Sequence, residues 1–431
     1  MQRVIQSAYA LFLNNVYKVT SKISEEKREK IIFTVVTFYS CFIMFCHASN
    51  ITKTVVNDYR AGIVFCFSIL LIIVFSVDRQ LKYIRWRPLM LKIYYALFLL
   101  MLLVSCFHKV GTGHRIYILA SLILLPMLYY VWGNRQDYYV LYSIVAKGFC
   151  YSGLSYFVAT WLFFPKDFYT SAAGAYLGAT HNPNVLGAIG FGMAIAALYL
   201  YMTEKSKFVP ILTIVAGVNL ISMGQSRTAF LSFFCPLIML LIVIFYIVFI
   251  KKKVFYKNKL RLLIICIAFI VISVPIIEAM FSYINTAFAD SEGLIDKFKS
   301  GTSSGRIELW KYCLSNLHLF GNDVGPRIFF EGVNYAGAHN SIIEMAYRYG
   351  IIAGTLYVVL GIICVIYCVR IFINDKWENS LFVCLIMCAL SVYLMFELVF
   401  LPYKVGVGYM SMFALTGLFN YNVEKTNIDK Y

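Results

Sequence analysis

The sequence predicts an all-α polytopic membrane protein with about 12 transmembrane helices and one long exterior loop. Its composition is 61% hydrophobic and only 14% charged, whereas an average soluble protein is about 25% charged. The apolar residues come in blocks of about 20, enough for a helix to cross about 30 Å of hydrocarbon. A single long polar interval, 282–340, separates these blocks. We expect that interval to carry short helices.

The apolar blocks give the expected helices in chain order. The seventh block is short and is interrupted by Gly217 and Asn219, and the last one is weakened by its glycines. The twelve expected spans are 31–48, 61–77, 89–107, 116–132, 139–164, 183–201, 208–223, 229–250, 262–281, 342–369, 380–400 and 405–420. Three parts follow, namely 1–281 with the N-terminus and nine helices, the exterior loop 282–340, and 341–431 with three helices and the C-terminus.

The basic residues predict the orientation of these helices. If the N-terminus is cytoplasmic, the inner segments hold about three times as many Lys and Arg residues as the short outer loops. Both termini are then cytoplasmic. The net charge of +17 is therefore a topology signal and does not indicate a nucleic-acid partner. The same orientation places four segments on the outer face, namely 165–182, 224–228, 282–340 and 401–404.

Several classes of site have no sequence signature in this chain. It has no Walker-type phosphate loop, no Gly-x-Ser-x-Gly elbow and no His-Glu-x-x-His zinc pair. Of its 12 cysteines, only Cys313 lies in the long loop, and none shows metal-ligand spacing. The outer segments also lack an acidic cluster that would hold a divalent ion. We therefore expect no metal and no cofactor.

Arg306 is the first candidate site residue. Ser304 is a suitable N-cap and Glu308 suits a first turn, so a helix is expected to start here with Arg306 in that turn. Free N–H groups at a helix start favour an anion, and a guanidinium matches the geometry of phosphate. The alternative is a surface arginine, or one paired with Glu308. The expected apolar face of this helix comprises Ile307, Trp310, Leu314 and Leu317.

His339 precedes the expected tenth span. Ser341 and Glu344 fit a capping box, with Ser341 as the cap and Glu344 reaching back. His339 would then lie at the outer boundary of the membrane, where a histidine can act as a general base. The alternative is a structural histidine. For Glu344, capping explains the sequence better than catalysis does.

Two further helix starts carry candidate residues. Arg227 interrupts apolar sequence at an outer position, and such a charge tends to face a polar cavity or an anionic ligand unless it snorkels to the headgroups. At the sixth span, Asn182 and Pro183 suit the N-cap and the first helical position. His181 and Asn184 remain as candidates to line the same exterior site, although a purely structural helix start explains them equally well.

Together these residues resemble the O-antigen polymerase and O-antigen ligase superfamily (Wzy/WaaL type). The resemblance covers roughly 170–370. It rests on Asn184 and on three short motifs in a fixed order around one long exterior loop. These motifs are Ser226-Arg227-Thr228-Ala229, then Ser304-Gly305-Arg306 with Leu309-Trp310, and finally His339-Asn340 before a helix with Gly350 and Gly354.

The resemblance implies a GT-C-like glycosyltransferase of the bacterial cytoplasmic (inner) membrane. Its partners would be an undecaprenyl-pyrophosphate-linked glycan donor and acceptor, membrane lipid and a chain-length regulator. No nucleotide sugar or metal is implied. His339 would activate the acceptor hydroxyl, and Arg227 and Arg306 would bind the pyrophosphate. Further substrate-binding positions are assigned to His181, Asn184, Asn340 and Glu344.

Three functions remain open at this level. A polymerase of O-antigen or capsule repeats is favoured, because the exterior loops lack an extra basic patch for phosphorylated lipopolysaccharide core. An O-antigen ligase would instead transfer the glycan to lipid A core. A lipid-linked oligosaccharide flippase belongs to a different class and would need charges through the membrane depth. The candidate charges here gather at one face.

Overall fold

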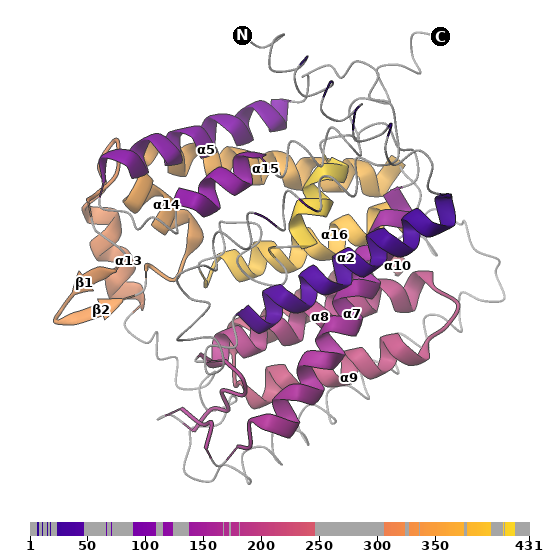
Figure 1. Cartoon of the computed structure of the whole chain (residues 1–431). Coiled ribbons are helices and arrows are strands. Elements are labelled where there is room, and N and C mark those ends of the chain that lie inside the picture. Colours follow the sequence, from indigo (N-terminus) through magenta and orange to yellow (C-terminus); the bar gives the residue numbers. More distant parts are fainter. Residues whose placement is uncertain are drawn as a thin grey trace.

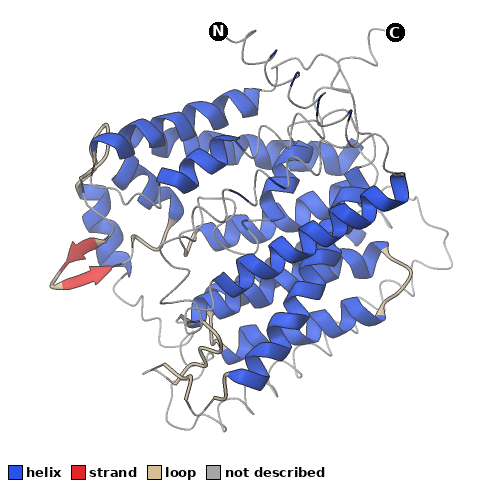
Figure 2. Ribbon diagram, in the orientation of Figure 1, coloured by secondary structure: helices blue, strands red, loops and turns tan. Residues whose placement is uncertain are grey.

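The structure is a computed structural model of the chain (Figure 1). It describes residues 24–46, 89–108, 115–123, 138–166, 168–171, 174–180, 182–245, 306–323, 327–335, 337–374, 377–397 and 410–418, with isolated positions at 7, 11, 15, 18, 66, 70 and 408. These residues are mostly helical, and one small two-stranded sheet lies at the periphery (Figure 2). The expectation of a predominantly helical protein is confirmed.

The helices follow the apolar blocks closely. The third and seventh expected spans agree with the structure at both ends, and Gly217 and Asn219 lie inside a continuous helix. The second and ninth spans (61–77 and 262–281) lie outside the described ranges, and the fourth and twelfth are described only in part. The helices are α2 (Glu25–Cys46), α5 (Leu89–Phe107), α7 (Tyr138–Phe163), α8 (Pro183–Thr203), α9 (Phe208–Met223), α10 (Arg227–Phe245), α13 (Arg306–Ser315), α14 (Ser341–Tyr349), α15 (Ile351–Asn374) and α16 (Trp377–Leu394).

Three of the described helices are long and apolar enough to cross a membrane. They are α5, α8 and the stretch Ile351–Phe372 of α15. Shorter apolar stretches occupy α9, α10 and α16. The helix α8 is buried among its neighbours, whereas only 22% of the apolar stretch of α15 is buried. This part of the chain therefore has transmembrane character.

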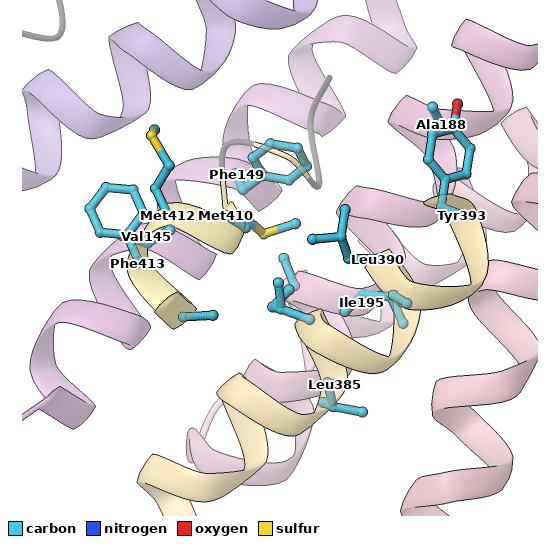
Figure 3. Packing of buried hydrophobic residues seen from close by; sticks show 14 of the residues in the cluster. Val145, Phe149, Ala188, Ile195, Leu385, Leu390, Tyr393, Met410, Met412 and Phe413 are labelled. Atoms are coloured by element: carbon cyan, nitrogen blue, oxygen red, sulfur yellow. The ribbon is translucent and has the colours of Figure 1, made fainter. Parts of the chain in front are cut away.

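The main core forms around α8, which packs against α7, α9, α10 and α16. Figure 3 shows Phe149 of α7, Ile195 of α8 and Leu390 of α16 meeting in this core beside Met410. Helices α8 and α9 approach closely because glycine faces glycine. A Cβ on Gly190 would lie 2.6 Å from the Gly217 carbonyl oxygen, and the reverse distance is 2.5 Å.

The expected tenth span, 342–369, is wrong as a single helix, because it breaks at Gly350 into α14 and α15. Gly350 has a φ of 99°, and its added Cβ would lie 2.2 Å from the Leu319 carbonyl oxygen. The His318 carbonyl also accepts from the Ile351 N–H at 3.1 Å. The chain at His318 and Leu319 therefore packs into the break between α14 and α15. Gly354 instead packs α14 onto α15, since its Cβ would lie 2.6 Å from the Ala346 Cβ.

Gly350→Ala is expected to destabilise the protein. A positive φ of this kind costs a side chain about 1–3 kcal/mol, and the contact with the Leu319 carbonyl adds to that cost. Gly361→Ala is the matched control, because nothing lies within 4 Å of its added Cβ. The unfolding temperature of the detergent-purified protein measures the difference. Equal temperatures for the two variants would contradict the proposed break.

A small lobe lies at the N-terminal end of α15, to the left in Figure 1. We use "the lobe" for the described residues of 306–349, namely α13, β1 (Ile328–Phe330), β2 (Val333–Tyr335), α14 and their connections. The strands are antiparallel, with Phe329 opposite Asn334. The lobe has its own core, made of Leu309, Cys313, Ile328, Ala338 and Tyr347.

The predicted apolar face of α13 is correct only in part. Trp310 and Leu317 pack against the lobe core as expected. Ile307 and Leu314 are exposed, whereas Leu309 and Cys313 are fully buried. The reason is that the strands and α14 cover α13 from that other side. The periodicity of a ten-residue helix with few apolar positions could not predict which face these elements cover.

Cys313 is expected to resist thiol reagents in the folded protein. Burial, with the nearby Glu344 carboxylate, raises the pKa of the Cys313 thiol to about 12, so the reactive thiolate is scarce near neutral pH. Mass spectrometry of the tryptic peptide 312–327 after maleimide treatment measures its labelling. Leu314→Cys is the control, because Leu314 is exposed and lies on the same peptide. Rapid labelling of native Cys313 would show that the lobe core is open.

Candidate active site

The turn that follows α16 is the point where four of the candidate residues meet, namely Asn184, Arg306, His339 and Asn340. The eleventh span was expected to continue to residue 400, but α16 ends at Leu394 and residues 395–397 turn away. The three carbonyls of this turn all accept hydrogen bonds from the lobe. The donors are Asn340 Nδ2 to Met395 O (3.0 Å), Arg306 Nη1 to Phe396 O (3.1 Å) and Ser341 Oγ to Glu397 O (2.7 Å).

The side chain of Glu397 joins three residues from distant parts of the chain. Its Oε1 accepts from Asn184 Nδ2 at 2.9 Å and lies 3.4 Å from Arg306 Nη2. Its Oε2 lies 3.5 Å from His339 Nδ1. The Glu397 side chain is 12% exposed, and those of Arg306 and His339 are each 24% exposed. A mostly covered site thus holds a carboxylate within contact distance of a guanidinium and an imidazole.

His339 has a backbone conformation that is unusual for a residue with a side chain. Its φ is 52°, in the left-handed region, and such conformations persist where the surroundings impose them. Here the neighbouring Ala338 is held on both sides of its backbone. Its carbonyl accepts from Trp310 Nε1 at 2.6 Å, and its N–H donates to Glu344 Oε2 at 2.7 Å. The lobe therefore fixes where the imidazole projects.

The helix cap after His339 differs from the expected one. Asn340, not Ser341, is the N-cap of α14, and its Oδ1 accepts from the N–H groups of Ile342 and Ile343. Glu344 does not reach back to the cap. Both of its carboxylate oxygens are used within the lobe, one by Ala338 N–H and the other by Arg348 Nε at 2.7 Å. Glu344 and Asn340 are buried, so in this structure both support the His339 loop.

Asn184 reaches Glu397 from the start of α8. Asn182 caps this helix, its side chain accepting from the Asn184 N–H at 2.8 Å, and Pro183 follows at the first position. Both sequence expectations for this start are confirmed. The Asn184 side chain then points away from the cap and donates to Glu397. His181 lies outside the described residues.

Arg227 begins α10, and this helix start packs on the start of α8. A Cβ on Gly187 would lie 2.7 Å from the Ser226 Cβ, and one on Gly224 would lie 2.8 Å from the Pro183 carbonyl oxygen. Arg227 is half-buried. The structure therefore places it at a helix start beside the one that carries Asn184. Ser304 and Gly305 lie outside the described residues, whereas Arg306 is the first residue of α13 as expected.

Glu397 was not identified from the sequence. It lies in the apolar run 394–400 and was included in the eleventh span. A carboxylate inside such a run is itself a signal, because intramembrane acids are costly and usually face a partner or a polar site. Applied to this chain, that rule would have selected Glu397 as a candidate site residue, as it selected Arg227.

The arrangement combines a potential base with fixed positive charge. An imidazole can accept a proton near neutral pH, and a guanidinium can stabilise a developing phosphate charge. Across the described ranges, no group of three or more His, Cys, Asp or Glu residues is placed to hold a metal ion. Comparisons with protein-family models, with curated proteins and with solved structures found no match to this chain.

Proposed function

We propose that this chain is a membrane glycosyltransferase that polymerises undecaprenyl-pyrophosphate-linked oligosaccharide repeats into a surface polysaccharide, such as O-antigen or capsule. One observation supports this above all. His339 and Arg306, expected from the sequence as the base and the anion-binding residue, both lie against the Glu397 carboxylate. A glycosyl transfer from a pyrophosphate can use a base for the acceptor hydroxyl and a fixed positive charge for the leaving group, and these two residues can supply them.

In the proposed reaction, a sugar hydroxyl of the acceptor repeat attacks the anomeric carbon of the lipid-linked donor. His339 takes the hydroxyl proton as the new C–O bond forms. The bond between the anomeric carbon and the pyrophosphate oxygen breaks, and undecaprenyl pyrophosphate leaves with the electron pair. Arg306 and Arg227 stabilise the charge that develops on this leaving group. The growing chain is thereby moved onto the acceptor repeat.

The proposal places this chemistry on the outer face of the bacterial cytoplasmic membrane. The helices α5, α8 and α15 supply three spans, and the apolar blocks of the sequence supply the others to make about 12. The basic residues then place both termini in the cytoplasm. In this orientation Arg227, Arg306 and His339 belong to outer segments, and Asn184 lies at the outer end of α8. A donor whose lipid lies in the membrane would reach them from the outer leaflet.

Analysis of surface glycans and lipid-linked intermediates in a deletion strain tests the proposal. Loss of a polymerase leaves single repeats facing outward, together with surface lipid carrying one repeat. Loss of a ligase leaves full-length polymer that is not transferred to lipid A core, and loss of a flippase leaves repeats facing inward. Either of the last two outcomes would overturn the proposed polymerase.

A further inference from the structure

Nitrogen Nδ1 of His339 faces a carboxylate oxygen of Glu397. It is buried, makes no hydrogen bond among the described residues, and lies 3.5 Å from Glu397 Oε2. This distance is longer than a hydrogen bond. In empty enzymes, however, catalytic hydrogen bonds are often long and shorten when substrate binds.

The nearby Glu397 carboxylate decides which nitrogen of the neutral His339 ring carries the proton. A neutral imidazole has one N–H donor and one nitrogen with a lone pair. If Nδ1 carried the lone pair, that lone pair would face a negatively charged oxygen in a site shielded from water, which is repulsive. A proton on Nδ1 makes the same approach attractive. The second nitrogen, Nε2, then keeps the lone pair.

Glu397 is itself held in place from both its backbone and its side chain. Its carbonyl accepts from Ser341 Oγ, and its Oε1 accepts from Asn184 Nδ2. These contacts leave Oε2 as the oxygen directed at His339. The His339 backbone is fixed in turn by the contacts of Ala338 and Asn340. The carboxylate and the ring therefore have little freedom to change partners.

We propose that Glu397 is a positioning residue that keeps the proton of neutral His339 on Nδ1 and so makes Nε2 the basic nitrogen. When Nε2 takes a proton, the ring becomes positively charged, and the same carboxylate stabilises that charge. The assignment of Nε2 as the base for an acceptor hydroxyl rests on the proposed function. The position of the proton does not.

The ¹⁵N spectrum of the histidine-labelled protein tests the proton position directly. At about pH 9, where a histidine of ordinary pKa is neutral, the two tautomers give different ¹⁵N shifts. The chain has six histidines, and the signal lost in His339→Asn identifies the one required. We expect the Nδ1–H form in the wild-type protein. The Nε2–H form in the wild type would overturn the proposal without reference to activity or to any Glu397 variant.

Glu397→Gln is the companion variant. Glutamine keeps the size and an acceptor oxygen but adds an NH₂ group that can donate to Nδ1, so the Nε2–H form is expected to increase. An unchanged tautomer in a folded Glu397→Gln protein would also overturn the proposal. Glu397→Asp, which keeps the charge, is expected to retain the Nδ1–H form.

The activity of these variants separates this inference from the proposed function. With a lipid-linked repeat as substrate, Glu397→Gln is expected to lower kcat about 10²–10⁴-fold, the range of general base catalysis. Glu397→Asp is expected to recover part of that loss, and the KM for the repeat is expected to change little in either variant. A changed tautomer with unchanged kcat would support the positioning role of Glu397 but would contradict His339 as the base.

Discussion

His339→Ala is expected to abolish polymer formation while the protein remains in the membrane at its normal level. Without the imidazole, no group at this position can take the proton of the acceptor hydroxyl, and loss of a general base lowers rates about 10²–10⁴-fold. The fold is expected to tolerate the change, since Nδ1 makes no hydrogen bond among the described residues. Complementation of a deletion strain, with polymer followed on gels and protein by immunoblot, measures both quantities.

His318→Ala is the matched control for this prediction. His318 belongs to the same lobe and its side chain is exposed, while its carbonyl contacts with Gly321 and Ile351 do not depend on the side chain. Full-length polymer is expected from this variant. Full-length polymer from His339→Ala would refute its role as base. Loss of polymer in both variants would indicate general damage to the lobe. The result for His339→Ala would then give no support for His339 as the base.

The helical ends that sequence predicted well are those set by local chemistry. Asn182 and Pro183 start α8 because an asparagine cap and a first-position proline act within one turn. The break at Gly350 was not predictable in this way. It depends on the chain at Leu319 and Gly321 packing against the helix, which is a contact between segments far apart in sequence. The buried face of α13 depends in the same way on β1, β2 and α14, which cover it.

The residues of the candidate site also differ in whether local sequence could predict them. Arg306 and His339 were found because each lies at a helix start with a recognisable sequence, and the resemblance placed them in one pattern. Glu397 lies in an apolar run with no such start, and only the turn after α16 brings it to them. Glu344 was expected to cap the helix from its spacing and to bind substrate from the resemblance. Its partners Ala338 and Arg348 instead define it as support for the His339 loop.

Polymerisation is expected to require the shape of the Arg306 guanidinium as well as its charge. One terminal nitrogen donates to the Phe396 carbonyl while the other approaches Glu397 Oε1, an arrangement that a single ammonium group does not reproduce. Arg306→Ala is therefore expected to abolish polymer. Arg306→Lys keeps the charge but is expected to lose activity by at least about 10-fold, the equivalent of about 1.4 kcal/mol of leaving-group stabilisation.

Arg327→Ala provides the control, because Arg327 is an exposed arginine of the same lobe beside β1. It is expected to leave polymerisation unchanged. Initial rates with purified lipid-linked repeat over a range of concentrations give kcat and KM for each variant. Because Arg306 is proposed to act on charge that develops as the pyrophosphate leaves, the loss should fall mainly on kcat. Wild-type rates in Arg306→Lys would reduce Arg306 to a structural tie between α13 and the turn after α16. A loss confined to KM would make it a binding residue that does not act on the leaving group.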